Sequence, residues 1–277
     1  MPQSATARGN PLATVLQRIP PFPMAMVSIM RGCANESAGL AEIAEAVSME
    51  EVLAARIVQA ANSAALAPVQ PVDSVTAAVA RLGSAAVRSI ATAYFLNSAF
   101  SAGFTRACLD RESVWRHSLA VSAASAGVAG AAGQRSYAYF AGLMHDVGIL
   151  VFATELGRAY GDCIAEAIRR KVELFRIEKA LLGIDHAEIG AVAAQAWNFP
   201  SEVIEAIARH HQVLGSTPMS PIVSHVVVGN QVAKEMGFGI SSSYGPLSPQ
   251  DRSKAAPNVS AGLMSRARWA LTNELPR

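Results

Sequence analysis

The chain has 277 residues, of which 51% are apolar and 16% charged, so it can bury a shared core and is not a disordered protein. Its formal net charge of +2 is too small to indicate a surface for nucleic acid or anionic membranes. The three cysteines are few, odd in number and far apart, which excludes a disulfide framework and predicts a reducing, cytoplasmic location.

Helical patterning runs through the first half of the chain. Residues 1–18 are predicted to be a flexible arm, because they are polar and rich in small residues. Apolar residues then recur at spacings of three and four, which is typical of amphipathic helices. The predicted helices are 24–31, 37–49, 50–65, a helix that starts at Asp73 or Ser74 and ends at Gly83, and 84–101.

The second half continues as helices joined by short loops, predicted at 112–132, 136–154, 156–171, 172–182, 185–197, 201–212 and 220–236. The helix at 112–132 is expected to be central, because its alanine, serine and glycine residues let neighbouring backbones approach closely. Gly183 suits a helix end, and Asp185 with Glu188 suits a capping box. Residues 239–277 are predicted to be a Ser/Pro/Gly-rich linker and tail with a short helix at 261–271.

One apolar stretch, 137–154, has the length of a membrane span. It carries His145 and Asp146 at its centre, where ionisable groups are costly in lipid. We therefore expect a buried core helix and no membrane association. Because no segment alternates convincingly at period two, the sequence predicts an all-α fold.

Five of the six histidines lie on predicted helices or at their ends beside apolar residues: His117, His145, His186, His210 and His211. His145 and Asp146 are adjacent, and neither is buried cheaply unless it is hydrogen-bonded or bound to a cation. Imidazole and carboxylate groups together are ligands that Zn, Mn, Fe or Ni favour. Two interpretations stay open, namely one or two metal ions inside a helical bundle and a buried polar network. The sixth histidine, His225, is expected to be a hydrogen-bonded core residue.

Short motifs along residues 19–230 resemble the HD superfamily of metal-dependent phosphohydrolases and, within it, the HD-related output domain, HDOD. In the order of that family they are IPPFP at 19–23, AANSA at 60–64, VTAAVARLG at 75–83, WRHS at 115–118, LMHDVG at 143–148, LGIDHAEIGA at 182–191, WNFP at 197–200 and HH at 210–211. Two of these motifs also have a local structural interpretation. Asn62 and Ser63 are expected to end a helix, and Trp197 and Phe199 are expected to anchor neighbouring helices.

The resemblance implies a multi-helix HD-like bundle with an additional N-terminal helical subdomain. The HDOD domain would span 19–238, divided into subdomains 19–107 and 108–238. It also implies a ligand set for a divalent transition metal (Fe, Mn, Zn or Ni). Matched residue by residue, this set falls on His117, His145, Asp146, His186, His210 and His211, and the final aspartate of the family falls on Asn230.

Several positions depart from relatives that cleave cyclic dinucleotides. Ile149 stands where those relatives have a lysine, and no Gly-Tyr-Pro segment follows His211. Ser113 replaces an acidic ligand, and Asn230 offers a neutral oxygen where the family has a charged one. These substitutions remove negative charge from the metal ligands, and they remove the positive charge that would face a phosphate.

The resemblance therefore implies a bacterial signal-transduction output module that acts on an unidentified signalling protein. We expect no hydrolytic turnover, no catalytic residue and a monomer or weak dimer. The alternative is a metal-dependent phosphohydrolase that acts on a nucleotide or cyclic nucleotide through the same ligand set.

Overall fold

The computed structural model describes residues 39–63, 70–129, 132–214, 217–240 and 265–268, together with six residues between 19 and 29. Within these residues the chain is all-α and contains no strand, as the sequence predicts. The expected arm at 1–18 lies outside the described residues, as does most of the expected tail. Of the expected first helix, the described residues Ala25, Met26, Ser28 and Ile29 are helical.

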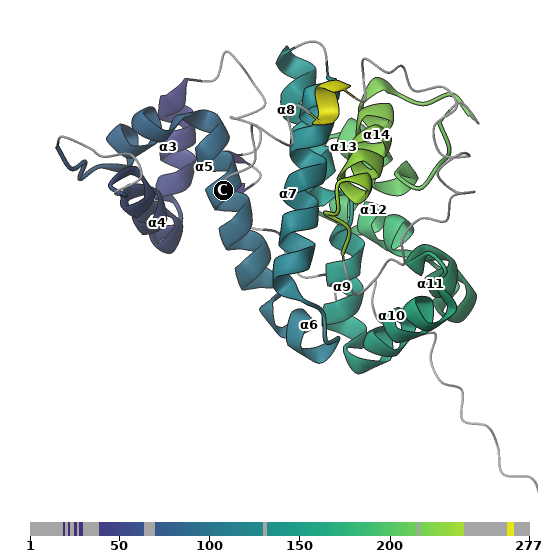
Figure 1. Ribbon diagram of the computed structural model, residues 1–277. Helices are drawn as coiled ribbons and strands as arrows, with labels where there is room; N and C mark the ends of the chain where they lie inside the picture. The colour runs from purple at the N-terminus through teal and green to yellow at the C-terminus, as the bar shows by residue number, and fades with distance from the viewer. Residues whose placement is uncertain are drawn as a thin grey trace, which may run out of the picture.

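The N-terminal helices form one side of the molecule in Figure 1. The long helix α5 has a kink at Gly83, whose φ of 77° is not helical, so the predicted break at this glycine is confirmed. The short helix α6 was not predicted from the sequence. The bounds are α3 Leu40–Ser48, α4 Glu51–Ala61, α5 Val75–Ala99 and α6 Ser101–Arg106.

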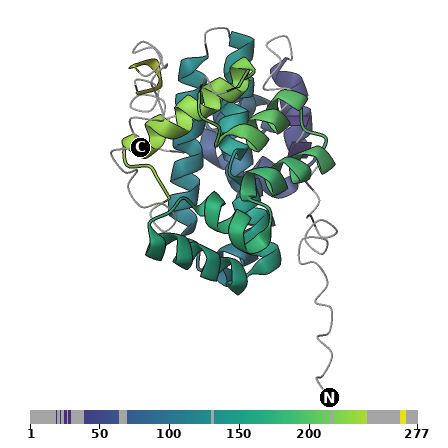
Figure 2. The same cartoon turned by 90° about the vertical axis from the view of Figure 1, so that its right-hand side faces the viewer.

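The C-terminal helices make up the rest of the structure (Figure 1). Figure 2 shows α10 and α11 gathered at one end, below α12, α13 and α14. The bounds are α7 Arg111–Val128, α8 Ala132–Met144, α9 Val147–Leu156, α10 Arg158–Arg170, α11 Leu174–Leu182, α12 His186–Ala196, α13 Ser201–Arg209 and α14 Pro221–Glu235.

The single helix predicted at 136–154 is wrong in one respect that matters for the site. Two helices, α8 and α9, replace it, and His145 and Asp146 form the turn between them. The Asp146 carbonyl accepts a hydrogen bond from the Ile149 amide, which starts α9. Apolar residues continue on both sides of the turn, so the sequence pattern does not reveal the break. The whole stretch Gln134–Leu156 is apolar enough to span a membrane, but 83% of its most apolar part is buried inside this fold.

Helix α7 is central, as its composition predicts, and packs chiefly against α8 and α14. Two glycines let these neighbours approach its backbone. A Cβ on Gly142 of α8 would lie 2.9 Å from the Ser122 Cα, and a Cβ on Gly229 of α14 would lie 2.8 Å from the Ser125 nitrogen. Any larger side chain at either glycine would push the helices apart.

Aromatic packing joins the two halves of the molecule. Phe22 and Phe95 from the N-terminal half lie 4.1 Å apart between ring centroids, and Phe22 also contacts Trp197 and Phe199 at 5.1 and 4.9 Å. The predicted anchoring role of Trp197 and Phe199 is thus confirmed.

The helix ends largely have the local structure that the sequence predicts. Gly183 has a φ of 79° at the end of α11, and Asp185 and Glu188 form a capping box at the start of α12. Asn62 follows α4, and its side-chain amide exchanges two hydrogen bonds with the backbone of Val72 at 2.7 and 2.8 Å. Asn62 therefore ties the end of α4 to the segment directly before α5.

A short helical piece at residues 265–268 lies against α14. Ala267 is fully buried, and the Arg268 guanidinium lies 2.9 Å from the Glu235 carboxylate. The described part of the predicted tail is therefore packed on the C-terminal helices.

Candidate metal centre

Six polar side chains from distant parts of the sequence meet inside the C-terminal helices. All but His211 are buried, and the exposed fraction of His117, His145 and His186 is 0%. The six are His117 on α7, His145 and Asp146 between α8 and α9, His186 at the start of α12, and His210 and His211 after α13. The structure thus brings together the whole predicted histidine and aspartate set.

The Asp146 carboxylate lies at the centre of this group. Its Oδ2 atom is 3.3 Å from Nε2 of His117 and 3.2 Å from Nε2 of His145. Its Oδ1 atom is 3.3 Å from Nε2 of both His186 and His210. Four imidazoles therefore point the same ring nitrogen at one carboxylate.

The opposite ring nitrogen of three of these imidazoles is held by a backbone carbonyl. The Nδ1 contacts are His117 to Phe238 O at 2.9 Å, His145 to Gly142 O at 2.7 Å and His210 to Ile207 O at 2.7 Å. A carbonyl only accepts, so each Nδ1 carries the hydrogen. In the neutral form of such a ring, the Nε2 atom presents a lone pair to Asp146.

Protonation of His145 or His210 does not relieve this crowding of acceptors. Burial lowers the pKa of His145 to about 4, although Asp146 opposes it, and burial likewise lowers the pKa of His210. Burial would raise the pKa of Asp146, but the neighbouring histidines hold it well below its usual range. An ionised carboxylate therefore faces the neutral rings of His145 and His210 near pH 7.

Several buried atoms at the site lack hydrogen-bond partners within the described residues. They include both oxygens of Asp146 and Nε2 of His210, and on α14 the Oδ1 atom of Asn230 is also buried without a partner. Buried polar atoms are rarely left unsatisfied, and all of these are acceptors that a cation would bind. The donor set thus fits a divalent transition metal, which also explains why each Nδ1 is fixed by a carbonyl.

His186 is held differently, by a carboxylate. Its Nδ1 atom lies 2.6 Å from Oε2 of Glu178, which also accepts from the His186 amide at 2.8 Å. The Tyr160 hydroxyl donates to the other oxygen of Glu178 at 2.5 Å. Burial would lower the pKa of His186, but Glu178 and Asp146 raise it to about 10. A cation bound at Asp146 would compete with this proton, so metal binding would release it.

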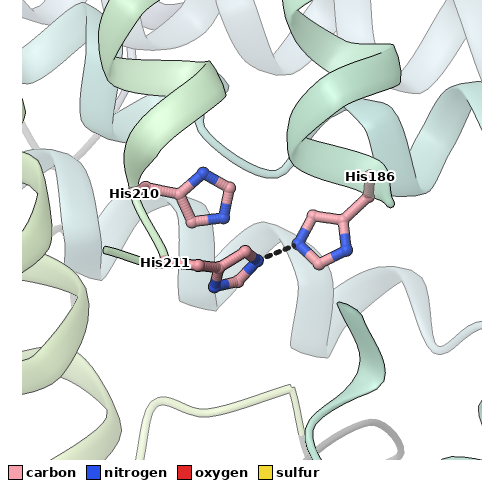
Figure 3. A group of neighbouring side chains, drawn as sticks. All are labelled: His186, His210 and His211. Atoms are coloured by element: carbon pink, nitrogen blue, oxygen red, sulfur yellow. Dashed lines mark hydrogen bonds between the residues drawn. The ribbon is translucent and has the colours of Figure 1, made fainter. Parts of the chain in front are cut away.

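The ligand atoms fall into two triads, one of His117, His145 and Asp146 and one of His186, His210 and His211. Within each triad the atoms lie within 4.8 Å of one another. Figure 3 shows the second triad, in which Nε2 of His211 lies 2.8 Å from Nε2 of His186. The ring of Phe175 stacks on His211 at 4.3 Å between ring centroids. Asp146 links the triads through its separate oxygens.

The departures seen in the sequence also have structural counterparts. Ser113 bonds to Asp110 at the start of α7, so its hydroxyl serves the helix cap. Ile149 is fully buried in the core. Asn230 is buried on α14, where its side chain offers a neutral oxygen.

Glu178 and Tyr160 were missed by the sequence analysis. A signal for Glu178 was present, because Leu174, Ile177 and Glu178 share the buried face of α11 at helical spacing. A carboxylate at a core position indicates a buried partner. Tyr160 carries no such signal, since a tyrosine on an apolar face is usual in a core.

We expect Glu178→Gln to weaken metal binding by about 10- to 100-fold, because Glu178 fixes the orientation and basicity of His186. Competition of the purified protein with a chelating dye measures this affinity.

Glu166→Gln is the matched control, because Glu166 pairs with Arg169 and Arg170 on the surface of α10. It should leave the affinity unchanged. Equal affinity in both variants would contradict a role of Glu178 in metal binding.

Comparison with known proteins gives a family and a fold. The family model of the HDOD domain matches residues 19–213. An HDOD domain protein of unknown function from Geobacter sulfurreducens superposes with a TM-score of 0.71 at 23% identity, covering 92% of this chain and 87% of that chain. This likeness shows the HD-like helical fold.

Two further solved structures are similar. A protein from Marinobacter aquaeolei VT8, provisionally described as a signal transduction protein, has a TM-score of 0.72 at 23% identity and covers 95% of this chain and 62% of that chain. A provisionally described phosphohydrolase from Shewanella amazonensis SB2B has a TM-score of 0.65 at 24% identity over 94% of both chains. An uncharacterized protein of Treponema pallidum (strain Nichols) is 24% identical over 231 residues, and the matched region spans 80% of this chain and 44% of that relative.

Proposed function

The chain belongs to the HDOD family, and from that premise we propose that it is a signal-transduction module whose helical core holds a metal centre without hydrolytic turnover. Its output is contact with a signalling partner protein, and the module itself acts as a monomer or weak dimer in the cytoplasm. The provisional role of the Marinobacter aquaeolei relative in signal transduction supports this proposal.

Enclosure of the donor atoms is the observation that carries it. His117, His145 and His186 are 0% exposed, and Asp146 and His210 are 4% and 3% exposed. A phosphate ester needs room beside an activated water and donors for its developing charge. The side chain of Ile149 is buried and aliphatic, so it offers no donor to such a charge.

The metal would be held by the His117, His145, Asp146, His186, His210 and His211 side chains, with Asn230 as a neutral candidate. When bound it supplies Lewis acidity and neutralises the buried carboxylate. The protein side chains hold the ring orientations through the three carbonyls and Glu178. In this proposal the centre fixes the relative positions of α7, α9, α12 and α13. A partner protein then recognises this arrangement of helices.

A second candidate function, metal-dependent hydrolysis of a nucleotide or cyclic nucleotide, is favoured by Lys234. This residue lies one helical turn after Asn230 on α14. Burial lowers the pKa of Lys234, while the charges of Asp146 and Glu173 oppose that shift. Lys234 offers a phosphate group the positive charge that Ile149 lacks.

Turnover separates the two functions. We expect no product from cyclic dinucleotides or smaller nucleotides when the protein is incubated with iron under anaerobic conditions, or with manganese or zinc, and analysed by chromatography. Each missing general acid or base lowers the rate by roughly 10²- to 10⁴-fold. Metal-dependent turnover that is lost in both His145→Ala and Asp146→Ala would overturn the proposal and establish the hydrolase.

A further inference from the structure

A cavity of about 810 Å³ lies between the N-terminal helices α4 and α5 and the helices α6, α7 and α9. Its volume is in the range of sites that take small organic molecules, and such sites often form between structural units. None of the metal-centre side chains lines it. The cavity is therefore a separate place from the centre.

The inner wall of this cavity is apolar. Phe104, Val114 and Leu150 line it and are at least nine-tenths buried. Tyr94 and Trp115 also line it and are only partly buried, so their rings are accessible from the cavity. Accessible aromatic rings beside an apolar wall favour a ligand with a flat, apolar body.

The rim provides a cation for the polar end of such a ligand. Arg56 lies on α4 with its guanidinium 5.6 Å from the centre of the Tyr94 ring. Within the described residues, no carboxylate lies within ion-pair distance of Arg56. The nearby Asp110 carboxylate caps α7 by accepting from the amides of Glu112 and Ser113 at 3.2 and 3.1 Å.

Arg111 and Glu112 also line the rim with opposite charges, and the Arg111 guanidinium lies 5.3 Å from the centre of the Phe104 ring. We propose that this cavity binds a small organic anion with a flat aromatic body. The body packs against Tyr94 and Trp115, and the carboxylate or phosphate group pairs with Arg56.

Two of the five helices that line the cavity, α7 and α9, carry or directly follow residues of the metal centre. Ser118 lines the cavity from α7, next to His117, and Leu150 lines it from α9, one turn after Asp146. Ser63 belongs to the AANSA motif and Trp115 to the WRHS motif, and the metal centre gives neither of these two residues a role. A bound anion would thus contact α7 and α9 directly.

The test uses 1-anilinonaphthalene-8-sulfonate, an aromatic anion that fluoresces on binding, and its neutral analogue N-phenyl-1-naphthylamine. The full chain should bind the anion with one-to-one stoichiometry. Arg56→Gln should weaken it about tenfold, the size of one charge-assisted contact, and leave the neutral analogue within about twofold. Ala93→Phe fills the cavity from α5 and should abolish binding of both probes. Arg169→Gln, on the exposed surface of α10, is the control and should change neither.

Competition then identifies the anionic group. Displacement by 2-naphthoate favours a carboxylate ligand, and displacement by naphthalene-2-phosphonate favours a phosphate ligand. The proposal is overturned if neither competitor displaces the probe, if Arg56→Gln binds the anion as the unaltered protein does, or if folded Ala93→Phe retains binding. Circular dichroism establishes that each variant is folded.

Discussion

Asp146→Ala is expected to remove all metal from the protein and to abolish the stabilisation that metal gives. Asp146 is the shared contact of four imidazole Nε2 atoms at 3.2–3.3 Å, so its loss leaves neither triad with an anionic ligand. A metal present at about a thousandfold excess over its dissociation constant stabilises the folded state by about 4 kcal/mol. Elemental analysis of protein purified without chelator or tag-derived nickel, together with thermal unfolding before and after chelation, measures both effects.

Two companion variants make this result specific. Asp146→Asn keeps the shape of the side chain and removes its charge, so it should also lose the metal. Asp162→Ala removes an exposed aspartate from α10 and should retain metal and melting temperature. Metal at an unchanged ratio in Asp146→Ala would place the ion elsewhere, and a chelator that leaves the melting temperature of the unaltered protein unchanged would argue against a bound ion.

Gly148→Ala is expected to destabilise the fold by about 3 kcal/mol or more, which lowers the melting temperature by roughly 10 °C. A Cβ at this glycine would lie 1.9 Å from the carbonyl oxygen of His186 and 2.9 Å from the Gly190 nitrogen. Both contacts are with backbone, which does not move aside as a flexible side chain does. The first turn of α9 therefore has to separate from α12, and this displaces Asp146 from His186.

The matched control for this substitution is Gly239→Ala, because a Cβ at Gly239 meets nothing within 4 Å. Chemical denaturation of both variants gives the free energies of unfolding, and metal affinity of any folded Gly148→Ala protein reports the displaced ligands. A stable Gly148→Ala variant with unaltered affinity would show that α9 and α12 pack less closely than described.

Much of the fold was predictable because it depends on local signals. The helix end at Gly183, the cap at Asp185 and the kink at Gly83 are each set by the backbone preferences of one or two residues. The central position of α7 followed from its small side chains. The break between α8 and α9 was missed, because a turn inside a continuous apolar stretch changes no periodic pattern.

For the candidate site, the ligand residues were predictable but their spatial arrangement was not. Histidines beside apolar residues, together with the family resemblance, were enough to select the six side chains that the structure brings together. Their arrangement around Asp146 was not predictable, because it depends on how four segments pack in three dimensions. The cavity beside Arg56 was likewise hidden, since its walls come from five helices that no sequence pattern connects.

The order in which the centre can form follows from where its ligands lie along the chain. His117 and His211 are separated by most of the C-terminal helices, and Asp146 and His186 lie between them. Contacts between residues so far apart in sequence form only after large loops have closed, which slows folding. An ion bound at this centre is therefore not expected to nucleate the bundle and would enter a nearly finished structure. Metal binding should therefore act mainly on the unfolding rate, because contacts that form after the folding transition state slow unfolding.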